Sequence, residues 1–352
     1  MRTFDLIAGL ELELDGYSLE GLRASINPEF ERHCTLVALS GGGLTGLGED
    51  VTYDPEAQLA FQQAGAVHDL SGRVSLAEFC ERTEQLDLFP VAPSDDAFRL
   101  YRLWSFHSAA LDLALHQAGQ PLHRAVGRKP QPMRYVASLR LGEPPSIEPV
   151  TKRLALDPTL RFKLDATSSW TPELLEALVA TGAVDSIDFK ALYSGTVVDQ
   201  APDPVLYRRV AEAFPGAWLE DPDLKDPETA AVLAGEHERI TWDVPIHGVS
   251  DIEALPFRPR MVNLKPSRIG SLPRLLDTYD HCARAGIGAY SGGQTELGVG
   301  RGQAQYLAAL FHPDTPNDLA PREYNQVDPP PGLPPSPLTA DFSAPGFRWP
   351  GD

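Results

Sequence analysis

The chain has 352 residues with a formal net charge of −19 at pH 7, and 42% of its residues are hydrophobic. This length allows two domains, or one large α/β domain with an addition, and the acidic balance argues against nucleic acid and anionic membranes as partners. The absence of an apolar run of about 18 residues argues against a membrane span, and acids within the N-terminal apolar stretch argue against a signal peptide. The cysteines, Cys34, Cys80 and Cys282, form no CxxC pair, so we expect reduced thiols in a cytoplasmic protein.

The first 60 residues have the pattern of β-strands. The stretch FDLIAGLELEL alternates in part between apolar and polar residues, and HCTLVALSGGGLTGLGEDV predicts a strand, a glycine turn and a second strand. Residues 75–119 predict helices, since Ser75 and Glu78 form a capping pattern and SDDAFRLYRLWSFHSAALDLALHQAG has apolar residues at helical spacing. Strands followed by helices predict an α+β domain, which we place at residues 1–128.

From residue 129 onward, short apolar runs alternate with helical stretches. The eight runs are RYVASLRL, RFKLDA, SIDFKALY, AWLEDP, ITWDVPI, MVNLKPS, GIGAYSGG and NDLAP. A β-α alternation repeated in this way predicts a (β/α)8 barrel, which we place at residues 129–320. The tail at residues 321–352 is rich in proline, so we expect extended coil that packs on the surface. The predicted fold class is therefore α/β, a TIM-like barrel with an N-terminal α+β capping domain.

Ionisable residues collect at the ends of the predicted barrel strands. Lys163 and Asp165 close the second strand, Asp188 and Lys190 the third, Glu220 the fourth, Asp243 the fifth and Lys265 the sixth. Catalytic groups lie at the C-terminal ends of barrel strands, because the loops open there. Charged residues are rarely buried unless they are paired or bind metal, so this succession of charged strand ends predicts a site.

The carboxylates of this set predict a magnesium site. Asp188, Glu220 and Asp243 come from three neighbouring predicted strands and offer hard oxygen ligands, which suit octahedral Mg²⁺. Lys163 and Lys265 flank these ligands on the second and sixth strands, where they could act as base and acid on a carbon between them. A divalent ion beside a substrate carboxylate would stabilise the enolate-like charge that forms when an α-proton is lost.

Several segments resemble the enolase superfamily, in its mandelate racemase and muconate-lactonising branch. GLTGLGEDV is similar to that family's G-x-GE stretch, AALDLALHQAGQPLHRAVGR to the helix and linker before its barrel, WLEDP to its fourth-strand Glu motif, and VNLKPSRIGSLPRLLDTYDHCARAGI to its sixth-strand Lys segment. The resemblance implies one Mg²⁺ per active site, replaceable by Mn²⁺, and a racemase, epimerase or cycloisomerase that abstracts a proton α to the carboxylate of a small acid. It also implies a homo-oligomer.

The third-strand metal ligand has two candidates. LDATSSWTP resembles the family's DAN ligand stretch, which would make Asp165 the ligand. The next carboxylate, Glu220, would then lie 55 residues on (220 minus 165), and the run SIDFKALY would have no place in the barrel. Counting strands puts Asp165 on the second strand and Asp188 on the third, so we take Asp188 as the ligand.

The second strand departs from the family pattern. The family commonly has Lys-x-Lys there, whereas this chain has Lys163-x-Asp165. Residues two apart on a strand share a face, so Asp165 would pair with Lys163 or Lys190 and raise the pKa of that lysine. A one-base reaction led by Lys265 is then as plausible as a two-base racemisation. We keep Lys163, Lys265 and Asp165 as candidate catalytic residues, and Lys190, where the family often has Asn, as a candidate substrate contact.

Further candidate substrate contacts lie after the predicted strands. They are Tyr193, His247, Ser291, Gly292, Gln294 and Asp318. His247 lies just past the fifth strand, where a histidine is either a base or a loop or capping residue. The stretch SGGQTELGVG brings backbone N–H groups to a substrate carboxylate in one interpretation and is a glycine-rich turn in the other.

Three alternatives to an isomerase stay open. Asp165 and a single dependable base favour elimination, as in an acid-sugar dehydratase or another β-elimination lyase similar to o-succinylbenzoate synthase. A metal-free barrel with Lys163 or Lys265 as a Schiff-base lysine is a second alternative, although three converging carboxylates count against it. The third is a barrel that keeps its metal ligands but has lost catalysis and serves as a binding protein.

Overall fold

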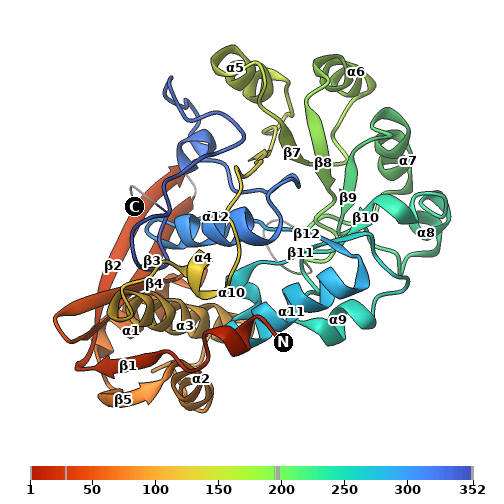
Figure 1. The fold of residues 1–352 in the computed structure, drawn as a ribbon. Helices are drawn as coiled ribbons and strands as arrows, with labels where there is room; N and C mark the ends of the chain where they lie inside the picture. The colour runs from red at the N-terminus through yellow and green to blue at the C-terminus, as the bar shows by residue number, and fades with distance from the viewer. Residues whose placement is uncertain (1, 28–29, 194, 196–198, 350–352) are drawn as a thin grey trace.

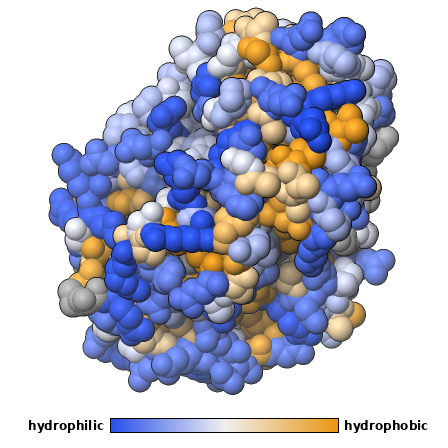
Figure 2. Space-filling view, turned by 90° about the vertical axis from the view of Figure 1, so that its right-hand side faces the viewer, coloured by the Kyte–Doolittle hydropathy of each residue, from blue (hydrophilic) through white to orange (hydrophobic). Residues whose placement is uncertain are grey.

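The chain folds into two parts that share one core. The computed structural model describes residues 2–27, 30–193, 195 and 199–349. Figure 1 shows an N-terminal part with strands β1 to β5, beside a larger part in which helices surround strands β6 to β12. One continuous cluster of buried apolar residues runs through both parts. Hydrophilic residues cover most of the face drawn in Figure 2, with hydrophobic residues in patches between them. Among the residues described, no helix is both long enough and apolar enough to cross a membrane.

The N-terminal part is built on a three-stranded antiparallel sheet in the order β2-β3-β4. Its strands are β2 (Gly16–Asn27), β3 (Phe30–Gly41) and β4 (Leu44–Asp50), with a second antiparallel pair of β1 (Glu11–Leu14) and β5 (Gly72–Ser75). Its helices are the 3-10 helix η1 (Phe4–Leu6), α1 (Pro55–Ala64), α2 (Leu76–Glu84), α3 (Phe98–Gln117) and α4 (Leu122–Ala125). This arrangement is the predicted α+β domain.

Helix α3 packs directly on strand β4. Residues 101–115 of the helix are all buried, which confirms the predicted long buried helix. Gly46 and Gly48 of β4 allow the contact, because a Cβ at either position would collide with a backbone carbonyl of α3. The N-terminal part is thereby a sheet with one covered face.

Two local signals in the N-terminal part are confirmed. Gly42 and Gly43 have φ angles of +59° and +76°, which glycine adopts without strain, and they form the predicted turn between β3 and β4. Ser75 and Glu78 form the predicted capping box at the start of α2.

The prediction of a strand through FDLIAGLELEL is wrong in its first half. Only Glu11–Leu14 form a strand, whereas Phe4–Leu6 form a 3-10 turn. The reason is tertiary: Phe4 is buried, and Thr3 donates hydrogen bonds from its backbone and side chain to Asp280, on helix α11 (Leu272–Ala285). A contact with a distant helix therefore overrides the local pattern.

The larger part alternates parallel strands with helices. Its strands are β6 (Ala137–Leu139), β7 (Phe162–Asp165), β8 (Val184–Asp188), β9 (Trp218–Glu220), β10 (Ile240–Thr241), β11 (Met261–Asn263) and β12 (Gly288–Tyr290). Its helices are α5 (Glu148–Leu156), α6 (Pro172–Thr181), α7 (Pro204–Ala213), α8 (Pro227–Val232), α9 (Val249–Glu253), α10 (Pro266–Ile269), α11 (Leu272–Ala285) and α12 (Gly300–Phe311), with short 3-10 helices η2 (His237–Arg239) and η3 (Arg322–Asn325). The predicted β-α alternation is present from β6 to α12.

The strands form two parallel sheets. One has the order β10-β9-β8-β7-β6, and the other pairs β11 with β12. The backbone N–H of Asn263, in β11, donates to the carbonyl of Trp242, just after β10, and this bond links the two sheets. The strands therefore follow one another in space in the order in which they occur along the chain.

The eighth predicted run, NDLAP, is not a strand in the part of the chain that the structure describes. Asn317 and Asp318 make single bridges to Tyr135 and Gly292, so they lie between the first and last barrel strands. Prolines border this run on both sides and cannot donate ladder hydrogen bonds, which limits the pairing. These two residues take the place of the expected strand.

The proline-rich tail is mostly coil, as its composition predicts, but it does not stay at the surface. Leu338 and Phe347 are buried, and Leu338 pairs with Met133 in a single bridge. The Phe347 backbone N–H and the Arg348 side chain donate to the buried carboxylate of Asp112 in α3. The tail therefore contributes to the core of the N-terminal part.

Candidate active site

The predicted site residues meet at one edge of the sheets. Strands β7, β8 and β9 end at Asp165, Asp188 and Glu220, and the parallel register places these carboxylates side by side. Asp243 and Lys265 each lie two residues past the end of a strand, β10 and β11. The C-terminal ends of parallel strands share an edge, which explains why residues far apart in sequence converge.

Lys163 is a buried ammonium between two carboxylates. Its Nζ lies 2.5 Å from Glu220 Oε1, 3.0 Å from Asp188 Oδ2 and 3.7 Å from Asp318 Oδ2. Burial alone would lower the pKa of Lys163, but the charges of these carboxylates raise it well above its usual value. Lys163 is only 1% exposed, so it neutralises the carboxylates rather than facing open space.

Lys190 is held against Asp188 and Asp165. Its Nζ contacts Asp188 Oδ2 and lies 3.6 Å from Asp165 Oδ1, while its backbone N–H donates to Asp188 Oδ1 over 2.9 Å. Its φ of +54° is unusual outside glycine and turns the residue back toward Asp188. Burial lowers the pKa of Lys190, but Asp165 and Asp188 raise it well above its usual value. The predicted pairing of Asp165 with a lysine is confirmed, and the partner is Lys190.

Asp243 is surrounded by donors. Its Oδ2 accepts hydrogen bonds of 2.8 Å from Lys265 Nζ and of 2.8 Å from the Tyr193 hydroxyl, and Arg268 Nη1 lies 3.3 Å from its Oδ1. Burial raises the pKa of Asp243, but the charges of Arg268 and Lys265 lower it well below its usual range. Asp243 is therefore a carboxylate that stays ionised.

Arg268 is a site residue that the sequence prediction missed. It is 5% exposed, and burial lowers its pKa, but Asp243 together with Tyr101 and Tyr193 raises that pKa well above its usual value. It lies three residues after Lys265, on the short helix α10, and residues at this spacing share a helix face. That spacing is the signal that could have found it.

Asp221 is a second missed residue. Its two carboxylate oxygens accept the backbone N–H groups of Asp243 and Val244, over 2.9 Å and 3.0 Å, and so hold the end of β10 in place. Burial and the charges of Asp243 and Asp188 raise the pKa of Asp221 to about 7. Asp221 directly follows Glu220 in WLEDP, but nothing in the sequence says which neighbouring strand it contacts.

Glu220 is a buried carboxylate with a partner at each oxygen. Its Oε1 binds Lys163 and its Oε2 accepts a hydrogen bond from the hydroxyl of Tyr290, at the end of β12. Burial raises the pKa of Glu220 to about 8, although the charge of Lys163 acts in the opposite direction. Glu220 therefore carries a burial cost that Lys163 does not fully offset.

The donor set fits a divalent cation. Six carboxylates and four cations form what we call the strand-end cluster: Asp165, Asp188, Glu220, Asp221, Asp243 and Asp318 with Lys163, Lys190, Lys265 and Arg268. The carboxylates outnumber the cations by two (six minus four), so one divalent ion would balance the cluster. Burial and the charges of neighbouring carboxylates raise the pKa values of Glu220 and Asp221, and a bound divalent ion would act in the opposite direction.

The structure groups the possible metal ligands differently from the sequence. Oxygens of Glu220, Asp221 and Asp243 all lie within 4.8 Å of one another, whereas the predicted set has Asp188 in place of Asp221. Asp188 instead binds the ammonium groups of Lys163 and Lys190. Glu220 and Asp243 belong to both sets.

Several buried polar atoms at the strand ends have no hydrogen-bond partner among the described residues. They are Asp165 Oδ1, Asp243 Oδ1, both amide atoms of Asn263, and Nε and Nη1 of Arg268. Buried polar groups are normally satisfied, and each exception needs a reason such as an ion, a water or a ligand. Their concentration at this edge is what a polar binding site requires.

The remaining predicted contacts divide into two groups. Asp318 is partly exposed beside Lys163, and Gly292 faces Lys265, where a Cβ would lie 2.7 Å from Lys265 Cε. Ser291 instead donates its hydroxyl to the carbonyl of Leu264, and Gln294 donates its amide to the hydroxyl of Tyr101 in α3. Asp318 and Gly292 therefore lie beside the lysines of the strand ends, whereas the Ser291 side chain binds neighbouring backbone and the Gln294 side chain binds a tyrosine of the N-terminal part.

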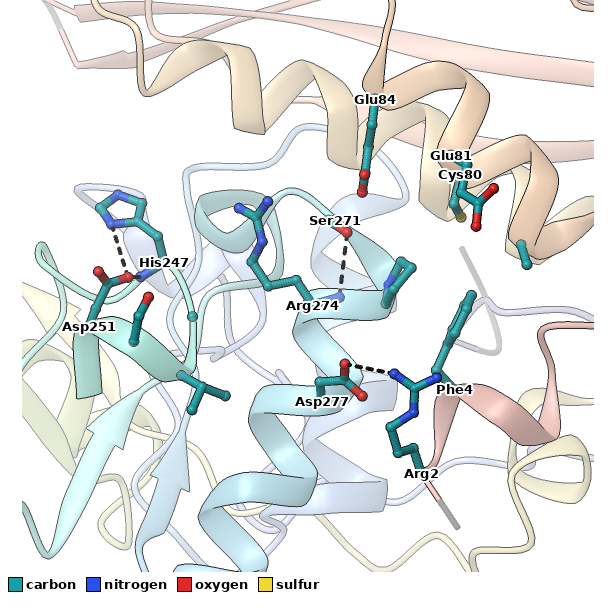
Figure 3. Close-up of a pocket in the computed structure, with 15 residues that line it drawn as sticks. Arg2, Phe4, Cys80, Glu81, Glu84, His247, Asp251, Ser271, Arg274 and Asp277 are labelled. Atoms are coloured by element: carbon teal, nitrogen blue, oxygen red, sulfur yellow. Dashed lines mark hydrogen bonds and ion pairs between the residues drawn. The ribbon is translucent and has the colours of Figure 1, made fainter. Parts of the chain in front are cut away.

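His247 lies in the loop between β10 and α9, four residues after Asp243. It lines a cavity of about 730 Å³ beside helices α2, α9 and α11, where Arg274 and Glu84 also lie (Figure 3). Its Nδ1 is 3.2 Å from the carbonyl oxygen of Pro245, and its backbone N–H donates to Asp251. The structure thus favours the interpretation of His247 as a loop residue.

Both halves of the chain match the same protein family. Residues 129–326 match the C-terminal domain, and residues 5–125 the N-terminal domain, of a family described as a domain of unknown function, DUF8230. The chain belongs to this family. An N-succinylamino acid racemase of Thermus thermophilus is 27% identical over 311 residues, which cover 84% of this chain and 80% of the relative.

Solved structures resemble the whole fold. A dipeptide epimerase from Methylococcus capsulatus, in complex with a Mg ion, has a TM-score of 0.70 at 17% identity, with 96% of this chain and 99% of that chain covered. A muconate cycloisomerase from Pseudomonas fluorescens has a TM-score of 0.65 at 19% identity, with 95% and 96% covered. At such identities the likeness shows the fold alone, and the chain shares this fold with a protein from Listeria innocua that is described as a member of the enolase superfamily, with a TM-score of 0.64 at 18% identity and 88% and 86% covered. The resemblance found in the sequence is confirmed.

Proposed function

We propose that this DUF8230 protein is a Mg²⁺-dependent enzyme that removes the proton next to the carboxylate of a small acid, as a racemase, epimerase or cycloisomerase. The convergence of buried carboxylates and lysines at one edge of the parallel strands carries this proposal. The names of the relatives, which are a racemase, an epimerase and a cycloisomerase, support it. We take the parallel strands, completed by residues 317–318, as a closed (β/α)8 barrel.

Glu220 and Asp243 are the ligands we place first, because both belong to the predicted set and to the set of oxygens that lie close together. We take Asp188 as the third ligand, and Asp221 as the residue that holds Asp243, since both Asp221 oxygens accept backbone N–H groups. When bound, Mg²⁺ supplies positive charge opposite the negative charge that develops on the substrate carboxylate.

Lys265 is the base in this proposal. Its Nζ is oriented by Asp243, and the missing side chain of Gly292 leaves space beside its last carbon. Lys190 is the cation on the other side of the site, where its ammonium would bind a substrate carboxylate while Asp165 and Asp188 hold it in place. Lys163 lies too deep to touch substrate and keeps the carboxylates of Asp188 and Glu220 neutralised.

A β-elimination is the second candidate function, and the asymmetry of the lysines favours it. Within the part of the chain that the structure describes, Lys265 forms an ion pair with one carboxylate, Asp243, whereas Lys190 lies between the carboxylates of Asp165 and Asp188. A lysine held in this way suits charge neutralisation better than proton removal. A racemase needs a proton carrier on both faces of the carbon, but an elimination needs only one.

Proton exchange in D₂O, followed by NMR with Mg²⁺ present, tests the proposal. The panel would start with N-succinylamino acids and continue with dipeptides, hydroxy acids and sugar acids. Deuterium at the α-carbon is the expected result, and the product then separates isomerase from lyase. If no compound exchanges although calorimetry shows that Mg²⁺ binds, the chain is a metal-binding barrel without this chemistry.

A further inference from the structure

One barrel segment is held by two side chains from the N-terminal part. The segment is the β12–α12 loop, residues 291–299, together with the first residue of α12. Arg32 of β3 donates from Nη2 to the carbonyl of Gln294 over 3.0 Å and from Nε to the carbonyl of Thr295 over 3.2 Å. The loop is thus bound through its carbonyl groups.

Glu49 of β4 binds the backbone N–H groups of the same segment. Its carboxylate accepts the backbone N–H groups of Leu297, Gly298 and Gly300, over 2.6 Å, 3.0 Å and 2.9 Å. Glycine permits this approach, since a Cβ on Gly300 would lie 2.9 Å from Glu49 Oε2. A carboxylate at the start of α12 is also favoured by the helix dipole.

Arg32 joins the loop to the N-terminal part by a single guanidinium. Besides the two loop carbonyls, it donates to the carbonyls of Val51 and Thr52, over 2.5 Å and 2.9 Å, just after β4. The side chain is 1% exposed, and its guanidinium carbon lies 3.9 Å from the centre of the Tyr53 ring. A buried guanidinium that binds carbonyls on both sides fixes the distance between them.

The loop needs this support because its backbone is strained. Thr295 has a φ of +55°, and a β-branched residue in left-handed backbone is costly, so surrounding contacts must maintain it. Its carbonyl is bound by Arg32, and its hydroxyl lies 3.2 Å from the Tyr53 hydroxyl. Both contacts come from the N-terminal part.

The supported loop forms the wall beside Lys265. Gly292 packs against Lys265 Cε, and the backbone N–H of Gly293 donates to the carbonyl of Asp318 over 3.0 Å. Gln294, which Arg32 binds, directly follows these glycines. A shift of the loop would therefore move the surface against which Lys265 rests.

We propose that Arg32 is a positioning residue: it fixes the β12–α12 loop against the N-terminal part and thereby sets the position of Lys265. The proposal deepens the proposed function and rests on it for the role of Lys265 as base. Arg32 and Glu49 together form a clamp on the loop, and this clamp can be tested without a substrate. One measurement therefore tests the backbone order of the loop, and a second tests the effect on Lys265.

Backbone hydrogen exchange, followed by mass spectrometry on the full chain, measures the clamp. In Arg32→Met, amides 297–303 should exchange roughly tenfold faster or more, as the loss of charged hydrogen bonds predicts. The matched control is Arg102→Met, because Arg102 is equally buried but binds Asp50 and the carbonyls of Leu88 and Ala57, all in the N-terminal part. Unchanged exchange in Arg32→Met, or equal acceleration in Arg102→Met, would overturn the proposal.

Kinetics with N-succinyl-L-phenylalanine measures the effect on Lys265. Arg32→Met should lower kcat for α-proton exchange about tenfold to a hundredfold while KM changes less, because the base rather than the binding groups is displaced. Arg32→Lys keeps the charge but cannot reach four carbonyls, so it should fall between the wild type and Arg32→Met, and it serves if Arg32→Met does not fold. If Arg32→Met has the same kcat per folded molecule as the wild type, the positioning role of Arg32 is overturned. Wild type without exchange would count against the proposed function, and backbone exchange would still decide the clamp.

Discussion

The two sides of the site distribute charge differently. The β7–β8 flank consists of Lys163, Asp165, Asp188 and Lys190, and the β11 flank of Asp243, Lys265 and Arg268. The first flank pairs two lysines with two carboxylates and is balanced, whereas the second pairs two cations with one carboxylate. The excess positive charge therefore lies on the β11 flank, where negative charge that develops on a substrate would be stabilised most.

The flanks also differ in how they are built. The β7–β8 flank follows from strand register, because residues 163, 165 and 188 lie on neighbouring strands that pair directly. The β11 flank depends on residues beyond the strand ends, on a helix of four residues, and on a loop held from the N-terminal part. In the proposed function, the β7–β8 flank binds and neutralises, while the β11 flank carries the residue that moves a proton.

Removal of Lys265 should have the largest effect. Lys265→Ala is expected to slow α-proton exchange by about 10²- to 10⁴-fold, the range typical of a lost general base. Lys190→Met should mainly raise KM, because it removes a substrate-binding cation. NMR exchange rates at saturating Mg²⁺ measure both variants. Full exchange in Lys265→Ala would place the base on the β7–β8 flank instead, with Lys190 as the next candidate.

Substitution of the carboxylates that lie on the flanks or between them should weaken Mg²⁺ binding to different degrees. Glu220→Gln is expected to weaken Mg²⁺ binding by at least about 100-fold, since one ligand charge is lost and Lys163 loses its nearest carboxylate. Asp188→Asn should act in the same direction, and Asp318→Asn, a carboxylate outside the ligand set, should act least. Calorimetry measures all three.

The same variants can contradict the choice of Asp188 as the third metal ligand. If Asp221→Asn removes Mg²⁺ binding and Asp188→Asn leaves it intact, the ligand set is that of the close oxygens, Glu220, Asp221 and Asp243. The β7–β8 flank would then contain no metal ligand, and counting strands in the sequence would have chosen the wrong residue.

Much of the site could be predicted because strand ends are local features. Alternating runs and caps locate Asp188, Glu220 and Lys265 along the chain, and parallel pairing then brings them together. Asp221 and Arg268 were missed because their roles depend on which neighbour they contact: Asp221 binds backbone of the next strand, and Arg268 reaches a carboxylate 25 residues earlier (268 minus 243). The sequence pattern does not show which residues these two side chains contact.

The contacts between the two parts of the chain could not be predicted at all. Arg32 lies in an ordinary strand pattern and Glu49 in the G-x-GE stretch, but only the docked structure shows that both bind the β12–α12 loop. The same limit explains the error at residues 4–10, where contact with α11 replaces the expected strand. Local propensity predicts elements, but long-range packing decides how their ends are used.

Substitution of Asp165 should have a moderate effect, and it tests the role of the balanced β7–β8 flank. The Asp165 charge raises the pKa of Lys190, so Asp165→Asn should lower that pKa. If the Lys190 ammonium binds substrate, KM should begin to rise at a lower pH in the variant than in the wild type, while kcat changes little. Profiles of KM against pH measure the shift. The matched control is Asp185→Asn, since Asp185 pairs with Arg161 and lies outside the cluster. Identical profiles would make Asp165 a bystander.

The smallest expected effect concerns the protons held between the flanks. Burial raises the pKa of Glu220 from an ordinary 4.5 to about 8 and that of Asp221 from 3.8 to about 7. Between these limits the folded protein keeps protons that the unfolded chain has released, so the metal-free protein should lose stability as pH rises from about 5 to 8. Bound Mg²⁺ displaces these protons, and it should therefore stabilise the fold more at pH 8 than at pH 6.

Melting temperatures with and without Mg²⁺ at pH 6, 7 and 8 measure this linkage. The gain from Mg²⁺ should grow with pH by a few degrees, as expected for a free-energy change of about 1–2 kcal/mol in a protein of this size. Glu220→Gln, which cannot ionise, should flatten the pH dependence of the metal-free protein. An equal gain at every pH would mean that the carboxylates are already ionised. The cations of the two flanks would then suffice to balance them, and the argument that the cluster lacks two positive charges would fall.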